Sequence, residues 1–154
     1  MTELMISQFP IETDAVYSDP RFTELTRIYA QLLGASWEHP ADILPGEHEL
    51  VVQMMRDCTD TFAIEEGGKV VGAAVVDIQS SAVWLESLVV DEKLRCRGLG
   101  MRALAAIETE VRARGCGVMK LASTKGAQSL YVRSGYTRDP SSGPMARYYK
   151  PLLD

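Results

Sequence analysis

Three consecutive segments of the sequence have the composition of β-strands and follow one another closely. They are TFAIEE (residues 61–66), KVVGAAVVDIQ (69–79) and VWLESLVV (83–90), all rich in β-branched and apolar residues. Gly67 and Gly68 join the first two segments as a hairpin turn, and two serines lie at the second join. Connections this short link antiparallel strands, because parallel neighbours need a long crossover. We therefore expect an antiparallel three-stranded unit, to which the rest of the chain must add.

Helical and strand-like patterns alternate in the rest of the chain. The expected elements are a strand in ELMISQFPI (3–11), a helix after Asp19 and Pro20 that stops at Gly34, a helix in ELVVQMMRDC (49–58), a helix over 98–114, a strand in GVMKLAS (117–123), a helix in KGAQSLYVRSG (125–135) and closing strands in YTRD (136–139) and MARYYKPL (145–152). The order β-α-α-β-β-β-α-β-α-β-β predicts the α/β class, with a mixed sheet flanked by helices. The helix over 98–114 should place the strands before and after it side by side and parallel.

Length and charge exclude several classes of protein. With 154 residues, of which 46% are hydrophobic, the chain is long enough for one core, and we expect a single domain over residues 1–154. A net charge of −5 provides no basic field for nucleic acid or an anionic membrane, and no segment approaches the roughly 18 apolar residues of a membrane helix. Three scattered cysteines fit neither a disulfide framework nor a zinc site, so we expect reduced thiols and a cytoplasmic protein.

The segment RCRGLG (95–100) concentrates two arginines and two glycines at the junction between the third strand and the long helix. The first N–H groups of a helix lack carbonyl partners, and the helix dipole is positive at that end. Gly98 and Gly100 leave those N–H groups accessible, while Arg95 and Arg97 add positive charge. The segment therefore predicts a cradle for a pyrophosphate. The simpler interpretation is a solvated turn that carries basic residues.

Two other phosphate-binding motifs do not fit this segment. A P-loop requires G-x-x-x-x-G-K-[S/T], which the sequence does not contain. GLGMRA (98–103) matches the dinucleotide fingerprint G-x-G-x-x-A, but that fingerprint begins directly at a strand end, and here DEKLRCR separates Val90 from Gly98. The acidic residue that the fingerprint needs about 20 positions further on is also missing, since that region reads MKLAS. A Rossmann dinucleotide unit is therefore not expected.

The segment RCRGLG does match the pattern R-x-x-G-x-G, with Arg95, Gly98 and Gly100 at its fixed positions, and the preceding strand ends in LVV. Further on, AQSLYVRSGY (127–136) reads as A-x-x-L-Y-x-x-x-G-F, with tyrosine in place of the final phenylalanine. With these two motifs on the expected elements, the chain resembles the GNAT superfamily of N-acetyltransferases. The resemblance implies the GNAT fold, a mostly antiparallel sheet whose parallel middle strands splay apart.

The resemblance also implies how acetyl-CoA binds. In the family, the pantetheine arm lies in the opening between the splayed strands, at positions that match Leu88, Val89 and Val90. The pyrophosphate is held mainly by main-chain N–H groups, at the positions of Arg95, Cys96, Arg97, Gly98, Leu99, Gly100 and Met101. The thiol of Cys96 is then expected to be incidental. Ser129 is a further candidate contact to the CoA arm. Thr124 stands where the family often has asparagine, and its hydroxyl is expected to cap the helix or to bond the pantetheine.

The reaction implied is transfer of the acetyl group from the thioester to a primary amine, by direct attack in a ternary complex. Glu86 is the candidate base for the amine proton, and in a regular strand it points to the same face as Leu88. The alternative is a polar side chain that only shapes the acceptor pocket. Tyr131 matches the tyrosine that in many family members donates a proton to the departing thiolate. The alternative is an aromatic ring packed on an apolar helix face with Ala127 and Leu130.

The remaining expectations concern partners. Neither His39 nor His48 has the neighbours of a metal ligand set, so no metal is expected. In the family, the loop between the first two helices lines the acceptor site, which points to GASWEHPADILPG (34–46) and its Trp37, and a small-molecule or peptide amine is the expected partner. Homodimers that form through the final strands are common in the family, and residues 145–152 leave that question open. A non-catalytic acyl-CoA-binding module on the same fold is the alternative to an enzyme.

Overall fold

The computed structural model describes residues 3–33, 46–57, 60–94, 98–143 and 146–152. Arg95, Cys96 and Arg97, and the loop that contains Trp37 and His39, lie outside these described residues. The strands are β1 (Leu4–Phe9), β2 (Asp60–Glu66), β3 (Lys69–Gln79), β4 (Ala82–Val90), β5 (Val118–Ala122), β6 (Thr137–Arg138) and β7 (Arg147–Pro151). The helices are α1 (Phe22–Ala30), α2 (Glu47–Arg56), α3 (Leu99–Ala113) and α4 (Gln128–Arg133), with 3-10 turns η1 (Asp14–Ser18), η2 (Gln31–Leu33), η4 (Glu92–Leu94) and η5 (Lys125–Ala127).

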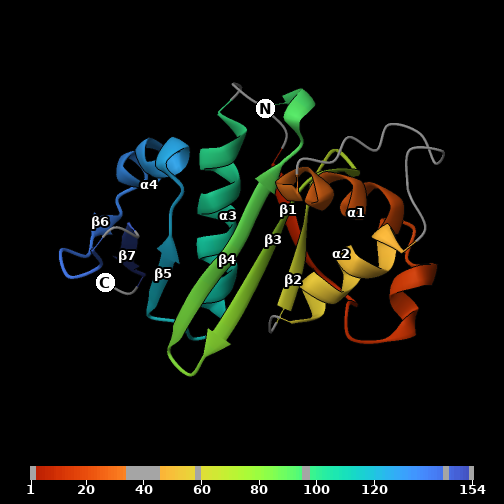
Figure 1. Ribbon diagram of the computed structural model, residues 1–154, viewed down its shortest axis with the longest axis horizontal. Helices are drawn as coiled ribbons and strands as arrows, with labels where there is room; N and C mark the ends of the chain where they lie inside the picture. The colour runs from red at the N-terminus through yellow and green to blue at the C-terminus, as the bar shows by residue number, and fades with distance from the viewer. Residues whose placement is uncertain (1–2, 34–45, 58–59, 95–97, 144–145, 153–154) are drawn as a thin grey trace.

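The strands form one seven-stranded sheet in the order β1-β2-β3-β4-β5-β7-β6 (Figure 1). Neighbouring strands are antiparallel except β4 and β5, which are parallel and joined through α3. Gly67 and Gly68 both have positive φ, 59° and 80°, as a two-residue hairpin turn requires. The mixed sheet and the parallel crossover expected from the sequence are therefore confirmed.

Each face of the sheet carries its own hydrophobic core. On one face, α1 and α2 pack over β2 and β3, where Leu25 and Ile28 meet Ala73 and Val75. On the other face lie α3 and Tyr131 of α4. There, Leu104 and Ile107 of α3 pack with residues of β2, β3, β4, β5 and β7. Figure 1 shows α1 and α2 at one end of the sheet and β5, β6 and β7 at the other.

A β-bulge interrupts β4 at Glu86. Val75 pairs with Ser87 and Val76 with Leu85, so Glu86 has no opposite residue in β3. As a result, Leu85 and Leu88 pack in the same core although they are three positions apart. The expectation that Glu86 and Leu88 share a face rested on regular alternation, and the bulge breaks that alternation between them.

Candidate functional site

β4 and β5 pair only along their first residues. Ala82 to Leu85 lie opposite Val118 to Leu121, and the described pairing stops there. From Glu86 to Val90, β4 still has β3 on one side but pairs with no described strand on the other. Backbone groups along this open edge can bond an extended ligand in the way that an added strand would. The edge therefore begins at the bulge and ends at the residue before the loop to α3.

The start of α3 has the features of an anion site. Gly98 is the N-cap residue, with φ of 71°, and no side chain caps the helix. The first helical bond runs from Arg102 N to Gly98 O at 3.2 Å, which leaves the N–H groups of the three preceding residues without a helical acceptor. No acidic residue occupies the first turn. The site is therefore positive and open.

The two glycines of this turn serve different purposes. Gly98 needs its positive φ, which other residues rarely adopt. Gly100 has an ordinary backbone, and a Cβ added there would meet only the side chain of Leu130, at 3.8 Å. Packing of the protein therefore does not require glycine at position 100, which fits space kept for a ligand.

The open edge and the helix start line one pocket of about 450 Å³. Its lining includes all three predicted β4 residues and the four described residues of the predicted cradle: Leu88, Val89, Val90, Gly98, Leu99, Gly100 and Met101. Two separate stretches of sequence, assigned to one ligand on pattern alone, thus converge in space. The open edge of β4 and the described part of the predicted cradle therefore face one cavity.

Three further residues line this pocket and were not singled out from the sequence. They are Leu32 from η2, and Leu130 and Arg133 from α4. Leu130 is the leucine of the A-x-x-L-Y pattern, so that motif could have indicated it. Arg133 is exposed, and its Nε donates to Ser129 O at 3.2 Å. Arg133 adds a cation at the pocket from a second helix. The RCRGLG segment contains no information about this contact, because Arg133 is far from it in the sequence.

A buried ion pair anchors the chain between the open edge and the cradle. Asp91, the residue after β4, accepts a bond from Arg27 of α1 at 2.7 Å and one from Gln31 at 3.3 Å. The same Gln31 accepts from Glu92 N at 3.0 Å. Burial by itself would raise the pKa of Asp91, but the bonds from Arg27 and Gln31 outweigh it and hold the pKa below its usual range. Helix α1 therefore fixes the direction in which the chain leaves β4.

Tyr131 is buried beside two other tyrosines. Its ring centroid lies 5.7 Å from that of Tyr136, edge to face, and 6.5 Å from that of Tyr148. The hydroxyl nevertheless has no hydrogen-bond partner among the described residues. Burial raises the pKa of Tyr131, so the phenol keeps its proton at neutral pH. The packing that the alternative interpretation predicted is present, and the hydroxyl remains free to donate.

A second buried network supports this aromatic cluster. Tyr136 donates to Glu108 of α3 at 2.9 Å, and Lys150 of β7 donates to the other oxygen of Glu108 at 2.8 Å. Lys150 also donates to Ser134 O at 2.8 Å. Burial, followed by the negative charge of Glu108, strongly raises the pKa of Tyr136. The network ties α3, the end of α4 and β7 together around Tyr131.

Of the predicted site residues that the structure describes, four do not line the 450 Å³ pocket: Glu86, Thr124, Ser129 and Tyr131. Glu86 is exposed, and its carboxylate makes no bond with any residue of the described ranges. Thr124 is the N-cap residue of η5, but its side chain makes no capping bond, so the capping prediction is wrong. Ser129 is exposed and contributes its carbonyl oxygen to Arg133. For Thr124 and Ser129 the contact with a CoA arm remains a prediction.

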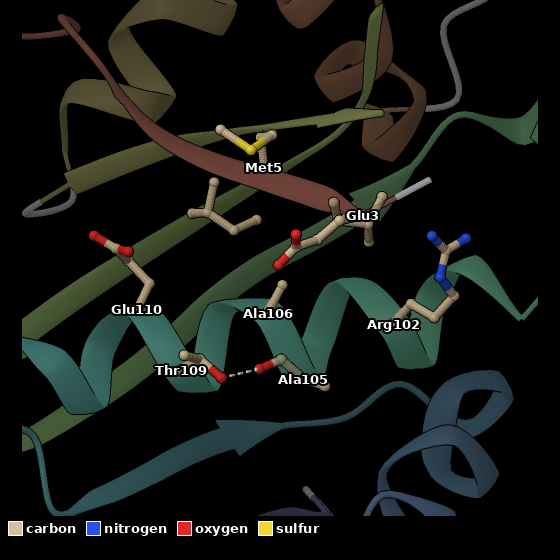
Figure 2. Close-up of a pocket in the computed structure, with 9 residues that line it drawn as sticks. Glu3, Met5, Arg102, Ala105, Ala106, Thr109 and Glu110 are labelled. Atoms are coloured by element: carbon tan, nitrogen blue, oxygen red, sulfur yellow. Dashed lines mark hydrogen bonds between the residues drawn. The ribbon is translucent and has the colours of Figure 1, made fainter. Parts of the chain in front are cut away.

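A larger cavity, of about 590 Å³, lies elsewhere, between β1 and α3. Figure 2 shows Glu3, just before β1, pointing toward Ala106 of the helix, whereas the side chain of Met5 lies on the far side of the strand. The lining is mostly apolar, and its cation, Arg102, already pairs with Glu66 at 2.7 Å. None of the predicted catalytic or cradle residues lines it. We therefore place the candidate site at the smaller pocket.

The described residues lack both a metal-ligand cluster and a membrane-spanning helix. No group of three or more histidine, cysteine, aspartate or glutamate residues in this part of the chain is arranged to hold a metal ion. No helix within it is both long and apolar enough to cross a membrane.

Comparison with protein families identifies this architecture. The family model described as the acetyltransferase (GNAT) family matches residues 22–136, which includes the open edge, the cradle and the Tyr131 motif. The match covers well over half of the chain, and the chain belongs to the GNAT acetyltransferase family. A comparison with curated proteins gives no significant sequence match.

Solved structures show the same fold. The aminoglycoside 6'-N-acetyltransferase of Enterococcus faecium superposes with a TM-score of 0.67 at 18% identity, over 97% of this chain and 98% of that one. The PaiA N-acetyltransferase of Thermoplasma acidophilum, in complex with coenzyme A, gives 0.63 at 14% identity over 97% and 99%. A GNAT family acetyltransferase of Elizabethkingia anophelis with acetyl-CoA bound gives 0.64 at 11% identity over 97% and 98%. At these identities the likeness concerns the fold.

Proposed function

We propose that this protein is an acetyl-CoA-dependent N-acetyltransferase that acetylates a primary amine by direct attack in a ternary complex. The observation that carries the proposal is the single pocket formed by the open edge of β4 and the uncapped start of α3. Solved relatives with coenzyme A or acetyl-CoA bound share the fold, which supports the choice of ligand.

The residues present fit such a ligand. The backbone of Leu88 to Val90 is positioned to bond the amides of the pantetheine arm, and the apolar side chains of Leu32 and Leu130 flank it. The free N–H groups at the start of α3 suit the pyrophosphate, because they combine donors with the positive end of the helix dipole. Arg133 adds a cation there. Arg95 and Arg97 are proposed to do the same, although they lie outside the described residues.

Bound acetyl-CoA would supply an acetyl group activated as a thioester. We propose that Tyr131 donates a proton to the sulfur that leaves, because its hydroxyl is unpartnered and burial keeps it protonated. Glu86 is proposed to take the amine proton, directly or through water. Its place in the bulge supports this role, because the open edge of β4 begins there and β-bulges are common beside active sites.

Substitution of Gly98 tests the donor site. Gly98→Glu places a negative side chain in the cradle and forces a positive φ on a residue with a Cβ. We expect acetyl-CoA binding, measured by isothermal titration calorimetry, to become undetectable. Gly143→Glu, which also has positive φ but lies outside the pocket, is the matched control and should bind normally.

Two outcomes would change the conclusion. Undiminished binding by Gly98→Glu would contradict the donor site. Tight acetyl-CoA binding by the wild type without thiol release, across a panel of amines, amino acids and peptides, would instead favour a non-catalytic acyl-CoA-binding module.

A further inference from the structure

A row of side chains crosses three strands on the face of the sheet opposite α3. Trp84 of β4 pairs with Lys120 of β5, which pairs with Tyr149 of β7. Their neighbours along each strand pack in the α3 core, so these three side chains alternate to the other face. Ala122 lies two residues after Lys120 in β5, about 7 Å along the strand, and it pairs with Arg147 of β7. Arg147 is therefore on the same face as Lys120.

The described helices leave this part of the face open. The core beneath α1 and α2 contains residues of β1 to β4 and none of β5, β6 or β7. Lys120 and Arg147 are exposed, and the Tyr149 side chain is 39% exposed. The surface is hollowed into a pocket of about 200 Å³, lined by Trp84, Lys120, Asp139, Arg147, Tyr148 and Tyr149.

The charge of this pocket is opposite to that of the whole chain. Lys120 and Arg147 form no ion pair with any residue that the structure describes. One carboxylate, Asp139, lines the pocket with them, and it accepts bonds from Ser141 N at 2.9 Å and Ser141 Oγ at 2.7 Å. These bonds, followed by the charges of Arg147 and Lys120, lower the pKa of Asp139. A second carboxylate, Asp77 of β3, pairs with Trp84 outside the lining. Two cations therefore face one anion in a protein of net charge −5. The flanking rings of Trp84 and Tyr149 add apolar surface.

The pocket adjoins the opening between β4 and β5. Leu85 and Leu121 form the last described parallel pair, and the Trp84–Lys120 pair is the one before it. Arg147 lies beside Ala122, one residue beyond Leu121. A small molecule in this pocket can therefore extend toward the open edge of β4, where the acetyl group would be presented. The location suits the acceptor rather than the donor, whose pocket has a different lining.

We propose that the acceptor is an amine that also carries an anionic group, held by Lys120 and Arg147 with its apolar part against Trp84 and Tyr149. The proposal rests on the proposed acetyltransferase function and adds the substrate class. It also separates this protein from the aminoglycoside acetyltransferases that share its fold, because a polycationic substrate would be repelled by the net positive charge of the pocket lining.

Matched amine pairs test this assignment. Thiol release from acetyl-CoA is measured with tyrosine and tyramine, lysine and cadaverine, phosphoethanolamine and ethanolamine, and kanamycin. We expect kcat/KM to be at least about tenfold higher for the anionic member of a pair, as one charge-assisted contact provides. The carboxylate and phosphate pairs distinguish the two kinds of anion. Equal use of both members, or a preference for kanamycin, would overturn the proposal.

A charge-reversed variant links the preference to the pocket. Lys120→Glu/Arg147→Glu should raise KM for the anionic amine at least about tenfold and leave the acetyl-CoA dissociation constant unchanged. The milder Lys120→Gln should raise KM less. Arg112→Glu, at an exposed position on α3 outside both pockets, is the control for a single charge reversal elsewhere on the surface and should behave as wild type.

Binding provides a readout that does not need turnover. The N-acetylated products of the same amines are titrated into the CoA complex by calorimetry, and anionic products should bind more tightly than neutral ones. Failure of every anionic product to bind, with none of the anionic amines acetylated, would reject the acceptor class. If the wild-type protein did not bind acetyl-CoA at all, the proposed function itself would be contradicted.

Discussion

Tyr131 shows how a side chain can be packed and still keep its reactive group. Its ring is enclosed by Tyr136 and Tyr148, while its hydroxyl has no partner in the described part of the chain. Among the described residues, this hydroxyl oxygen is not one of the buried polar atoms that lack a partner, so it is accessible although the ring is buried. An accessible hydroxyl with no protein partner can donate a hydrogen bond to a bound ligand.

Removal of this hydroxyl should affect the chemical step more than binding. We expect Tyr131→Phe to lower kcat by about a hundredfold to ten-thousandfold, the range of a lost general acid, with the acetyl-CoA dissociation constant nearly unchanged. Steady-state kinetics and calorimetry measure the two effects. Because burial raises the pKa of Tyr131, its deprotonation should not limit kcat below about pH 10.

The neighbouring tyrosine is the comparison for this variant. Tyr136→Phe loses the bond to Glu108, so its Tm should fall while kcat changes little. An unchanged kcat in Tyr131→Phe would exclude the proton-donor role.

At the scale of elements, helix α1 controls where the chain goes after β4. Its Arg27 lies between two carboxylates, with Asp91 at 2.7 Å and Glu24 at 2.9 Å. The Asp91 side chain is only 3% exposed and that of Glu24 is 45% exposed. Breaking the buried pair with Asp91 should therefore cost much more free energy of unfolding than breaking the exposed pair with Glu24. The bond to Glu24, followed by that to Asp91, raises the pKa of Arg27, which remains charged.

Breaking the Asp91 pair should lower both stability and donor binding. Arg27→Ala leaves a buried carboxylate unpaired, which costs about 3–5 kcal/mol in free energy of unfolding. The same change should weaken acetyl-CoA binding, because the chain leading to the cradle loses its anchor. Urea denaturation and calorimetry are the measurements. Glu24→Gln, at the exposed pair, should cost less than about 1 kcal/mol.

The same pair predicts a pH dependence. Folding lowers the pKa of Asp91. The ionised carboxylate therefore stabilises the fold at pH above the unfolded-state pKa of about 3.9, and this stabilisation is lost as the pH falls through the folded-state pKa. In Arg27→Ala this loss below pH 4 should be reduced. An acid transition identical to that of wild type would assign the effect to other carboxylates.

At the scale of the whole molecule, the Glu108 network joins parts of the chain that are far apart in sequence. Lys150 of β7 contacts both Glu108 of α3 and the carbonyl of Ser134 after α4. Lys150→Met should therefore lower the free energy of unfolding by about 1–3 kcal/mol. Hydrogen exchange should show faster opening around Tyr131 than around α1, which belongs to the other core.

Two comparisons sharpen this prediction. Lys69→Met, at an exposed lysine of β3, should leave the free energy of unfolding within about 0.5 kcal/mol of wild type. The double variant Glu108→Gln/Lys150→Met should recover part of the loss, because it no longer buries an uncompensated charge. A double variant less stable than Lys150→Met would show that the charge of Glu108 is not the cause.

Local patterns in the chain were enough to predict the order of the elements, the parallel crossover and a glycine-rich start of α3 suited to an anion. These features depend on local causes: the apolar period, the positive φ available to glycine, and the unpaired N–H groups of a helix start. Gly98 and Leu88 to Val90 could be identified for that reason. The RCRGLG and A-x-x-L-Y patterns then pointed to the family.

Which residues meet depends on tertiary packing. The bulge at Glu86 arises from pairing with β3, so strand alternation does not determine the face of Glu86 relative to Leu88. Arg133 reaches the 450 Å³ pocket from α4, and Lys120 and Arg147 become neighbours through the register of β5 and β7. Such juxtapositions depend on strand register and helix packing over long separations, and no local pattern encodes them. The proposed acceptor pocket depends on such juxtapositions.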